Sequence, residues 1–322
     1  MPLLKTNRVL LAKLESTVGT AESLGDADGV FCVYDVDINP NIDFQGRTQQ
    51  GGMSQLAGKT GAESCQLSFK MNMYGDGSGS AIPKWAETFL AACGLVQKTA
   101  SLVLSPSSKG VGAGAAGAAS ATPRSLTMGV YEDNAGLKKS LVGATGTCRF
   151  NFSAGQMVAL EFNFSGVWED VADNTSLPAP NYPDDLPMSC LGATMTLGGA
   201  TIPCWASLSF DLGNEVSLRP CATKAKGLVS SLITNRKVVG TIDPESTQVG
   251  TFDPYTDWTD STESALSLAI ADGTDTITLA APKVQFTNVQ EADRNGMQID
   301  SINFQCNADS DAGDDELSLT FG

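Results

Sequence analysis

The sequence contains no histidine among its 322 residues. Histidine is the most frequent general base and the most frequent metal ligand, so its absence removes the serine-triad base and most zinc sites. The cysteines show no CxxC spacing, which argues against a zinc ribbon. They stand at positions 32, 65, 93, 148, 190, 204, 221 and 306. We expect reduced, buried thiols that pack as small apolar side chains.

Charged and aromatic residues are also scarce, at 17% and 7% of the chain. The charge that is present is acidic, with 36 Asp and Glu against 20 Lys and Arg and a net charge of -16. A protein that wraps a phosphate backbone needs Lys and Arg, so this balance argues against tight nucleic-acid binding. It fits a soluble protein, or a surface that repels nucleic acid.

No apolar run approaches the roughly 20 residues that a membrane-spanning helix requires. The opening residues 1–17 interleave leucines with basic residues and lack a continuous apolar core and a cleavage site, so they do not predict a signal peptide. The apolar side chains of the N-terminal arm, residues 1–30, are expected to pack on their own domain or on a neighbouring subunit. No membrane partner is predicted.

The stretch 35–73 carries the clearest pattern. Its front half alternates, with Val36 and Ile38 facing opposite to Asp37, and its back half alternates again. Period-two alternation predicts two strands, each with one buried and one solvated face. Between them Gln45–Gly61 is polar, glycine-rich and far longer than a tight turn needs. We expect a loop arm here that is ordered by a partner.

Residues 82–94 predict an amphipathic helix packed on a sheet. Pro83 suits a first helical turn and Gly94 a C-terminal cap, while Trp85 and Phe89 share one face. Residues 105–123 have low complexity and predict a surface loop. Further strands are expected at residues 126–131, 138–142, 146–151 and 157–164. The proline-containing stretch 170–185 reads as an interdomain linker.

The second half repeats the order of the first. Five pairs of segments match in sequence order: 207–219 with 35–47, 237–243 with the strand from Cys65, 252–264 with the helix, 266–277 with 126–137, and 302–306 with 160–164. Ala222–Asn235 takes the place of the polar arm. Five pairs in order favour a duplication. We therefore expect a first domain at 1–175, a linker at 176–188 and a second domain at 189–322.

The densest acidic cluster, Asn307–Glu316, spaces Asn307, Asp309 and Asp311 as a calcium loop does. Its glycine comes one place late and no glutamate ends the loop, so a solvated acidic turn is the better interpretation. No nucleophile has a suitable base. The sequence predicts no enzyme, no metal and no cofactor.

Several segments resemble the tail tube (major tail) proteins of long, non-contractile-tailed bacteriophages. They are LLKTNRVLLAKLESTVGTAES at 3–23, the stretch from Arg47 to Ser78, PKWAETFLAACG at 83–94 and SLSFDLGNEVSLR at 207–219. The resemblance implies antiparallel β-sandwich domains that close into rings, which stack through long loops into a tube that conducts genomic DNA from capsid to host. Members with two fused domains form trimers with pseudo-sixfold symmetry, and single-domain members form hexamers.

Together these observations predict a mainly β protein with two similar antiparallel β-sandwich tail-tube domains, each with a flanking short helix and a long loop arm. The repeat favours a trimer ring, with a hexamer as the alternative. The expected partners are other copies of the chain, the tail terminator, tape measure and baseplate proteins, and double-stranded DNA that passes without tight binding. The resemblance places the protein in the virion tail after assembly in the host bacterial cytoplasm. A terminator or baseplate ring and a carbohydrate-binding β-sandwich are the alternatives.

Because the apolar strand faces must meet a core, the polar faces are free to line a channel. The expected channel-lining residues are Asp35, Asp37, Asp43, Gln66, Ser68, Ser207, Ser209, Asp211, Glu215 and Ser217. The expected residues of arms between rings or subunits are Arg47, Gln49, Met53, Leu56, Lys59, Lys224, Lys226, Leu228 and Arg236. The basic arm residues serve either solubility or pairing with acidic surfaces of identical neighbours.

Overall fold

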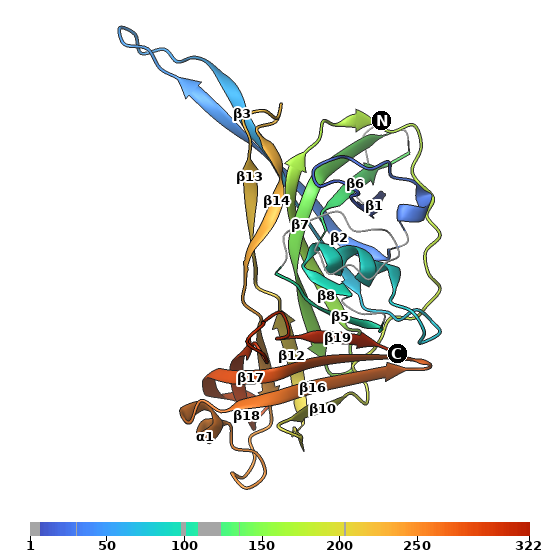
Figure 1. Ribbon diagram of the computed structural model, residues 1–322, viewed down its shortest axis with the longest axis vertical. Helices are drawn as coiled ribbons and strands as arrows, with labels where there is room; N and C mark the ends of the chain where they lie inside the picture. The colour runs from blue at the N-terminus through green and yellow to red at the C-terminus, as the bar shows by residue number, and fades with distance from the viewer. Residues whose placement is uncertain (1–6, 30, 98–100, 109–123, 135, 203) are drawn as a thin grey trace.

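The protein is mainly β, as the sequence predicts. The structure, a computed structural model, describes residues 7–29, 31–97, 101–108, 124–134, 136–202 and 204–322. Most of the low-complexity loop expected at 105–123 lies outside the described residues. The first half of the molecule forms the upper part of Figure 1, where its strands follow the long axis, and strands β16 to β18 cross the lower part.

The strands of the first half are β1 (Arg8–Leu14), β2 (Val33–Arg47), β3 (Leu56–Asn72), β4 (Leu95–Gln97), β5 (Val103–Pro106), β6 (Leu126–Glu132), β7 (Leu137–Ser153), β8 (Ala159–Trp168) and β9 (Ala172–Asp173). Those of the second half are β10 (Thr194–Leu197), β11 (Ala200–Thr201), β12 (Trp205–Asp211), β13 (Asn214–Pro220), β14 (Leu228–Arg236), β15 (Val239–Pro244), β16 (Glu263–Asp272), β17 (Asp275–Arg294), β18 (Met297–Asn307) and β19 (Ser318–Phe321). The helical segments are η1 (Asp26–Asp28), η2 (Ala86–Leu90) and α1 (Pro254–Thr259).

The two halves pair their strands in the same order. In the first half the antiparallel order is β2–β3–β8–β7–β6–β1. In the second half it is β12–β15–β18–β17–β16–β10, also antiparallel. Each half also has a helix at the corresponding place in the sequence. The helix η2 of the first half follows β3 and precedes β6, and α1 of the second half follows β15 and precedes β16. The recurrence follows the segment pairs that the sequence matches.

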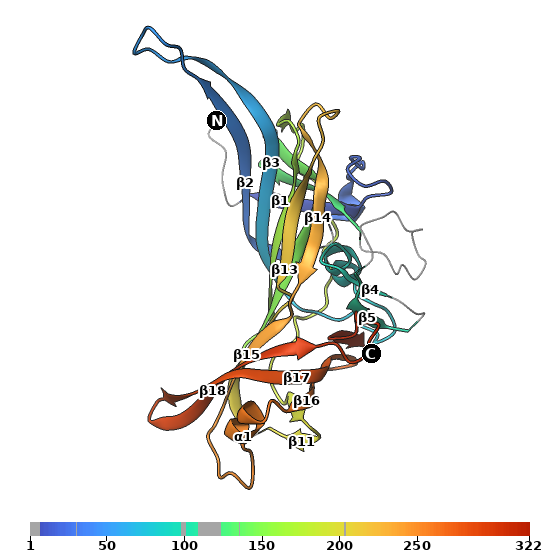
Figure 2. The ribbon, with the colours of Figure 1, turned by 60° about the vertical axis from the view of Figure 1, so that its left-hand side comes forward.

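An antiparallel ladder between β7 and β12 joins the halves. Its register sets Arg149 opposite Asp211, Phe150 opposite Phe210, and Ser153 opposite Ser207. One sheet of eight strands therefore runs without interruption through β2–β3–β8–β7–β12–β15–β18–β17. Figure 2 shows this sheet passing from β2 and β3 to β15, β17 and β18.

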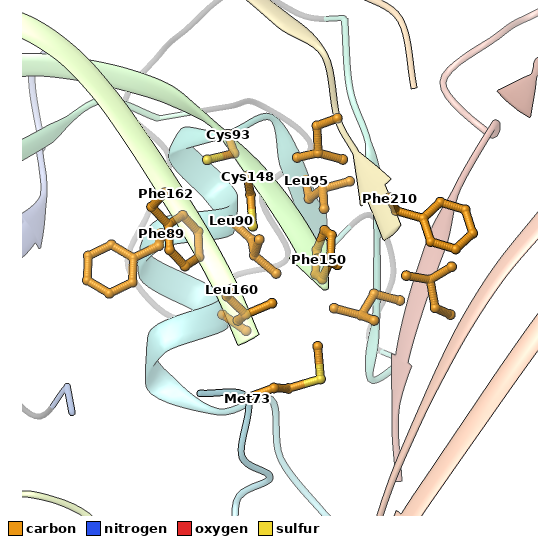
Figure 3. Close-up of a cluster of buried hydrophobic side chains, with 14 of the residues drawn as sticks. Met73, Phe89, Leu90, Cys93, Leu95, Cys148, Phe150, Leu160, Phe162 and Phe210 are labelled. Atoms are coloured by element: carbon orange, nitrogen blue, oxygen red, sulfur yellow. The ribbon is translucent and has the colours of Figure 1, made fainter. Parts of the chain in front are cut away.

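Alternation along β3 explains how the sheet gains one apolar face. Leu67 and Phe69 are fully buried, whereas Ser68 and Lys70 between them are partly exposed. The helix around η2 lies on the apolar face, and its side chains Phe89, Leu90 and Cys93 face the strands β7 and β8 (Figure 3). Burial of each large apolar side chain stabilises the fold by roughly 1.5–3 kcal/mol.

The predicted helix signals are confirmed. The indole Nε1 of the fully buried Trp85 donates to the backbone oxygen of Tyr74 at 3.0 Å, and Phe89 packs on Phe69 with ring centroids 4.9 Å apart. Gly94 ends the helix with a φ of 83°, a conformation that favours glycine.

We expect Gly94→Ala to lower the free energy of unfolding by about 1 kcal/mol, because alanine strains the left-handed backbone there. An added Cβ would stand 3.4 Å from Ile233 Cδ1, so the substitution fits sterically. Urea unfolding followed by circular dichroism measures the difference. Gly155→Ala, at a φ of 72° with open space around it, is the matched control for strain away from the helix.

The N-terminal strand β1 packs on its own half of the chain, which was one of the two expected arrangements; the other was packing on a neighbouring subunit. β1 pairs with β6 along its whole length. The carboxylate of Glu15, which is buried, accepts from Thr127 Oγ1 at 3.0 Å and from Gly143 N at 2.7 Å, and Ser125 Oγ also donates to it. These bonds satisfy a buried charge and fix the segment after β1.

Both predicted loop arms are wrong in their secondary structure. Most of Gln45–Gly61 continues β2 and β3, which stay paired as far as Arg47 opposite Leu56, so the loop is only residues 48–55. Most of Ala222–Asn235 belongs to β14, which pairs with β13. Polar, glycine-rich sequence has a weak strand signal, and the pairing across the hairpin continues nonetheless.

Two smaller expectations also need correction. The strands predicted at 138–142 and 146–151 form one strand, β7, with a bulge between Val142 and Thr145. Ile42 and Phe44 continue the alternation of the stretch 35–73, for which a buried apolar face is expected, but both side chains are exposed because the β2–β3 hairpin leaves the body there. Figure 1 shows this hairpin projecting from the molecule.

Candidate channel wall and assembly surfaces

The eight-stranded sheet has one continuous polar face, opposite to its core face. Aligned across it is a row of ionic side chains, with Lys70 opposite Glu161, Glu161 opposite Arg149, and Arg149 opposite Asp211. The Lys70 ammonium lies 3.6 Å from the Glu161 carboxylate and 3.8 Å from that of Asp35. Cations and carboxylates therefore alternate along this row.

A neighbouring row is uncharged. Asn151 lies opposite Ser209, Ser209 opposite Thr241, and Thr241 opposite Asn303. The hydroxyls of Ser209 and Thr241 are hydrogen-bonded at 2.8 Å. Hydroxyl and amide side chains thus cover the middle of the face, where strands of both halves meet.

The structure brings most of the expected channel-lining residues together on this face. Those on it are Asp37, Gln66, Ser68, Ser207, Ser209 and Asp211. Asp35 has a φ of 53° at a bulge in β2, and its carboxylate reaches the same face through Lys70. That this face lines a channel stays a prediction.

Three expected residues lie elsewhere. Glu215 and Ser217 belong to β13, which with β14 forms a separate two-stranded sheet. Asn214 Nδ2 donates to Cys93 O and to Gly146 O, so this hairpin starts on the side of the sheet that carries the helix. Asp43 is exposed on the projecting hairpin. The predicted register fails beyond the breaks at Pro40 and Gly213, where β2 runs on and β12 ends.

Sequence reasoning missed several residues of the polar face. They are Thr147, Arg149, Glu161, Asn163, Thr241, Asn303 and Gln305. The alternation along their strands would have found most of them, because they lie between buried neighbours, as Arg149 does between Cys148 and Phe150. The adjacency of β7 and β12, which places Arg149 at the centre, has no local sequence signal.

Some of the expected arm residues are exposed, and others are buried or form ion pairs within the same chain. Arg47, Gln49, Met53, Leu56 and Lys59 are exposed on the projecting hairpin, and Lys224 is exposed in the turn before β14. Leu228 is buried within the chain. Phe44, beside them on the hairpin, is 72% exposed. An apolar surface of this kind on a projecting hairpin is typical of an interaction site.

Lys226 and Arg236 have their acidic partners within the same chain. Lys226 Nζ lies 3.0 Å from Asp170 Oδ1 and 3.6 Å from Glu63 Oε2. The Arg236 guanidinium binds the carboxylates of Asp314, at 2.9 Å, and Glu316. Of the two roles considered for the basic arm residues, solubility and pairing with identical neighbours, neither describes these two, whose ion pairs connect the segment 226–236 to other parts of the same chain.

Burial of Asp314 raises its pKa, but hydrogen bonds from Ser108 and Arg236 outweigh that effect and hold the pKa below its usual 3.8. A lowered carboxyl pKa stabilises the fold above the unfolded pKa, and this contribution is lost as the pH falls through the folded pKa. We expect Asp314→Asn to lower the free energy of unfolding at pH 7. Between pH 5 and pH 3 the free energy of unfolding of the variant should fall less than that of the parent protein. Urea unfolding at several pH values tests this. Equal acid sensitivity of the two proteins would contradict it.

The cysteines are partly as expected. Cys65, Cys93, Cys148 and Cys190 are buried free thiols, and burial raises the pKa of Cys65 to about 12. Cys32 and Cys204 are exposed, so they are not core residues as predicted. Both lie next to strand ends, outside the alternating patterns. Among the described residues, no group of three or more acidic or cysteine side chains is placed to hold a metal ion.

The family model described as phage tail tube protein matches residues 6–321, and the chain belongs to that family. The resemblance read from the sequence is thereby confirmed. The family is a structural component of the virion tail and is generally non-enzymatic. No curated protein matches the chain. Within the described residues, no helix is long and apolar enough to cross a membrane.

Proposed function

We propose that copies of this chain form rings that stack into the tail tube, and that genomic DNA passes through the central channel to the host. One observation carries the proposal beyond family membership. Eight strands, four from each half, make one uninterrupted sheet with a polar face and a core face. Within one chain this sheet is open, with β2 and β17 as its outermost strands, and pairing with further copies would close it and remove the exposed edges.

The recurring strand order supports a trimer with pseudo-sixfold symmetry. Three copies supply about 24 strands, and at roughly 4.8 Å spacing and a tilt near 40° the backbone circle is on the order of 45 Å across. Side chains narrow this circle, yet a duplex about 20 Å wide still passes. A hexamer of full-length chains would be about twice as wide. The proposed domains are residues 1–175 and 189–322, with a linker at 176–188.

The proposed wall repels DNA weakly rather than strongly. Asp35, Asp37, Glu161 and Asp211 on the polar face are balanced in part by Lys70 and Arg149, and the row of Asn151, Ser209, Thr241 and Asn303 is uncharged. Lys70 is paired with Asp35 and Glu161, and Arg149 stands between Glu161 and Asp211 in the register, so the wall offers little net positive charge to phosphates, which matches passage without tight binding. The overall acidic charge adds repulsion over a screening length of about 8–10 Å.

The projecting β2–β3 hairpin is proposed to contact a neighbouring copy, in its own ring or the next. Its exposed Phe44 and Met53 have no core to join within the chain. The ends of the tube then meet the terminator, tape measure and baseplate proteins, in a virion tail assembled in the host bacterial cytoplasm. A terminator or baseplate ring would occur once per tail, so copy number in virions separates the two roles.

Negative-stain electron microscopy of the purified protein tests the proposal. The expected particles are rings or tubes with a central hole, at protein concentrations that favour assembly. Particles that remain single chains under all such conditions, together with a low copy number in virions, would contradict the role as tube subunit.

A further inference from the structure

The two outermost strands of the eight-stranded sheet, β2 and β17, each present an unpaired edge. Among the described residues β2 pairs with β3 alone, and β17 pairs from Asn288 to Arg294 with β18 alone. On the β2 edge, the carbonyl of Val36 already accepts from Arg8 Nη1 at 3.0 Å. A carbonyl oxygen can accept a second hydrogen bond. Open edges of this kind recruit another strand.

The internal β7–β12 ladder shows what such an edge binds. β12 occupies in the second half the place of β2 in the first, and β7 occupies the place of β17. The contact between the halves of one chain is therefore a template for the contact between one chain and the next. β12 meets β7 inside the chain, so β2 of one copy has its counterpart partner in β17 of another.

The ladders give the residue correspondence on the β17 side. Phe162 lies opposite Cys148, and Phe304 opposite Phe286, all four in the core. One step along the strands, Arg149 lies opposite Glu161. In the second half, beyond the bulge at 286–288, Asn288 lies opposite Asn303. Arg149 therefore corresponds to Asn288, and Phe150 to Val289.

The same comparison places β2 against β12. Asp37 lies opposite Ser68, and Asp211 lies opposite Val239. Ser68 precedes Phe69, which pairs with Phe162, and Val239 precedes Gly240, which pairs with Phe304. Asp37 therefore corresponds to Asp211, and Val36 to Phe210. The sequence match of 35–47 with 207–219 sets Asp37 against Ser209, two residues away from this structural counterpart.

We infer that β2 of one copy pairs antiparallel with β17 of the next, with Asp37 opposite Asn288 and Val36 opposite Val289. The inference rests on the proposed function. It specifies the contact between neighbouring copies in the ring, the pairing of β2 with β17, which we call the seam. On the core side, two valines replace the buried Phe150 and Phe210 of the template. On the polar side, a carboxylate meets an amide donor where the template pairs Asp211 with Arg149.

The ladder between β7 and β12 also indicates which residues direct their backbone N–H and C=O groups toward the neighbouring chain. Leu212 N donates to Cys148 O at 3.1 Å, so Cys148, Phe150 and Phe152 direct their backbone groups toward β12. Arg149 and Asp211 are then a non-hydrogen-bonded pair, with Cα atoms about 4.5 Å apart. The counterpart pair, Asp37 and Asn288, has the same geometry across the seam, which a disulfide can bridge.

The test is a disulfide between Asp37→Cys and Asn288→Cys in one chain, made in a Cys32→Ser, Cys204→Ser background that removes the exposed thiols. Within a chain the two positions are separated by seven strand spacings, about 34 Å. Any bond between them therefore joins two chains. After mild oxidation of assembled protein, non-reducing gel electrophoresis is expected to show a covalent trimer.

Two controls fix the register. Asp37→Cys with Gln290→Cys shifts the pair by two residues, about 7 Å along the strand, beyond disulfide reach. Arg149→Cys with Asp211→Cys should form the corresponding bond within one chain. Rings without the Asp37–Asn288 cross-link would overturn the seam and leave the proposed function standing. Failure of all variants and the parent to form rings would overturn both.

Discussion

Replacing Glu291 with proline should weaken ring assembly on the order of a hundredfold while leaving the single chain folded. Glu291 corresponds to Phe152, whose backbone N–H faces β12 in the internal ladder, so the N–H of Glu291 faces the open edge. Its side chain is exposed, and proline is tolerated at edge positions whose N–H makes no bond within the chain. In the ring, each seam loses a hydrogen bond worth about 1 kcal/mol and gains a steric clash.

Three seams per ring multiply the loss to about 3 kcal/mol, on the order of a hundredfold in the assembly equilibrium. Analytical ultracentrifugation measures the change. Glu291→Ala is the matched control, because it removes the same carboxylate and keeps the N–H, and it should assemble like the parent. Normal assembly of the proline variant, with its circular dichroism unchanged, would exclude this edge from the seam.

Placing lysine at Asn163 and Asn303 should slow DNA passage about tenfold or more without preventing tube assembly. Both side chains belong to the polar face of the eight-stranded sheet, one in each half. A trimer ring would gain six cations, and every ring of the tube would repeat them. Phosphates release counterions when they meet cations in this way, so the DNA binds the wall instead of sliding past it.

DNA ejection from virions that carry the variant subunit measures this effect, with its expected relief at high salt. Asn163→Asp with Asn303→Asp provides a control of similar shape and opposite sign, for which ejection should remain close to the parent rate. If the lysine variant forms normal tubes and ejects DNA at the parent rate at low salt, the polar face does not line the channel.

Local patterns in the sequence sufficed for much of the fold. Alternation predicts the two faces of β3, and Pro83, Trp85 and Gly94 predict a helix on the core face. The order of the segment pairs predicts the common strand order of the two halves. These features depend on neighbouring residues in the chain, where the physical signal is strongest.

Features that depend on contacts between residues far apart in the sequence could not be predicted from local patterns. The partners of Lys226 and Arg236 lie more than 50 residues away in the sequence. Ser230 and Ser231 are fully buried, and Ser231 is satisfied by bonds to Gly143 O and Ser165 O. A pair of serines reads as a surface loop, because their hydrogen-bond partners cannot be seen in the local sequence. The second arm was mistaken for a loop for this reason.

The sequence predicts only part of the candidate channel wall, because some of its residues are aligned by local alternation and others by contacts between distant strands. Asp37, Ser68 and Ser209 lie on one face because alternation is local. Arg149 was missed because only the ladder between the halves brings it beside Asp211. Its positive charge, between Glu161 and Asp211 in the register, changes the proposed wall from an acidic surface to one of mixed charge.

A cryo-electron microscopy reconstruction of assembled tubes tests the central claim most directly. The account predicts rings of three chains, with eight strands of each chain in a common barrel and Ser68, Asn163 and Ser209 directed into the channel. The seam should pair β2 with β17, with Asp37 opposite Asn288. A ring of six full-length chains, or a reconstruction with the polar sheet face on the outer surface, would contradict it.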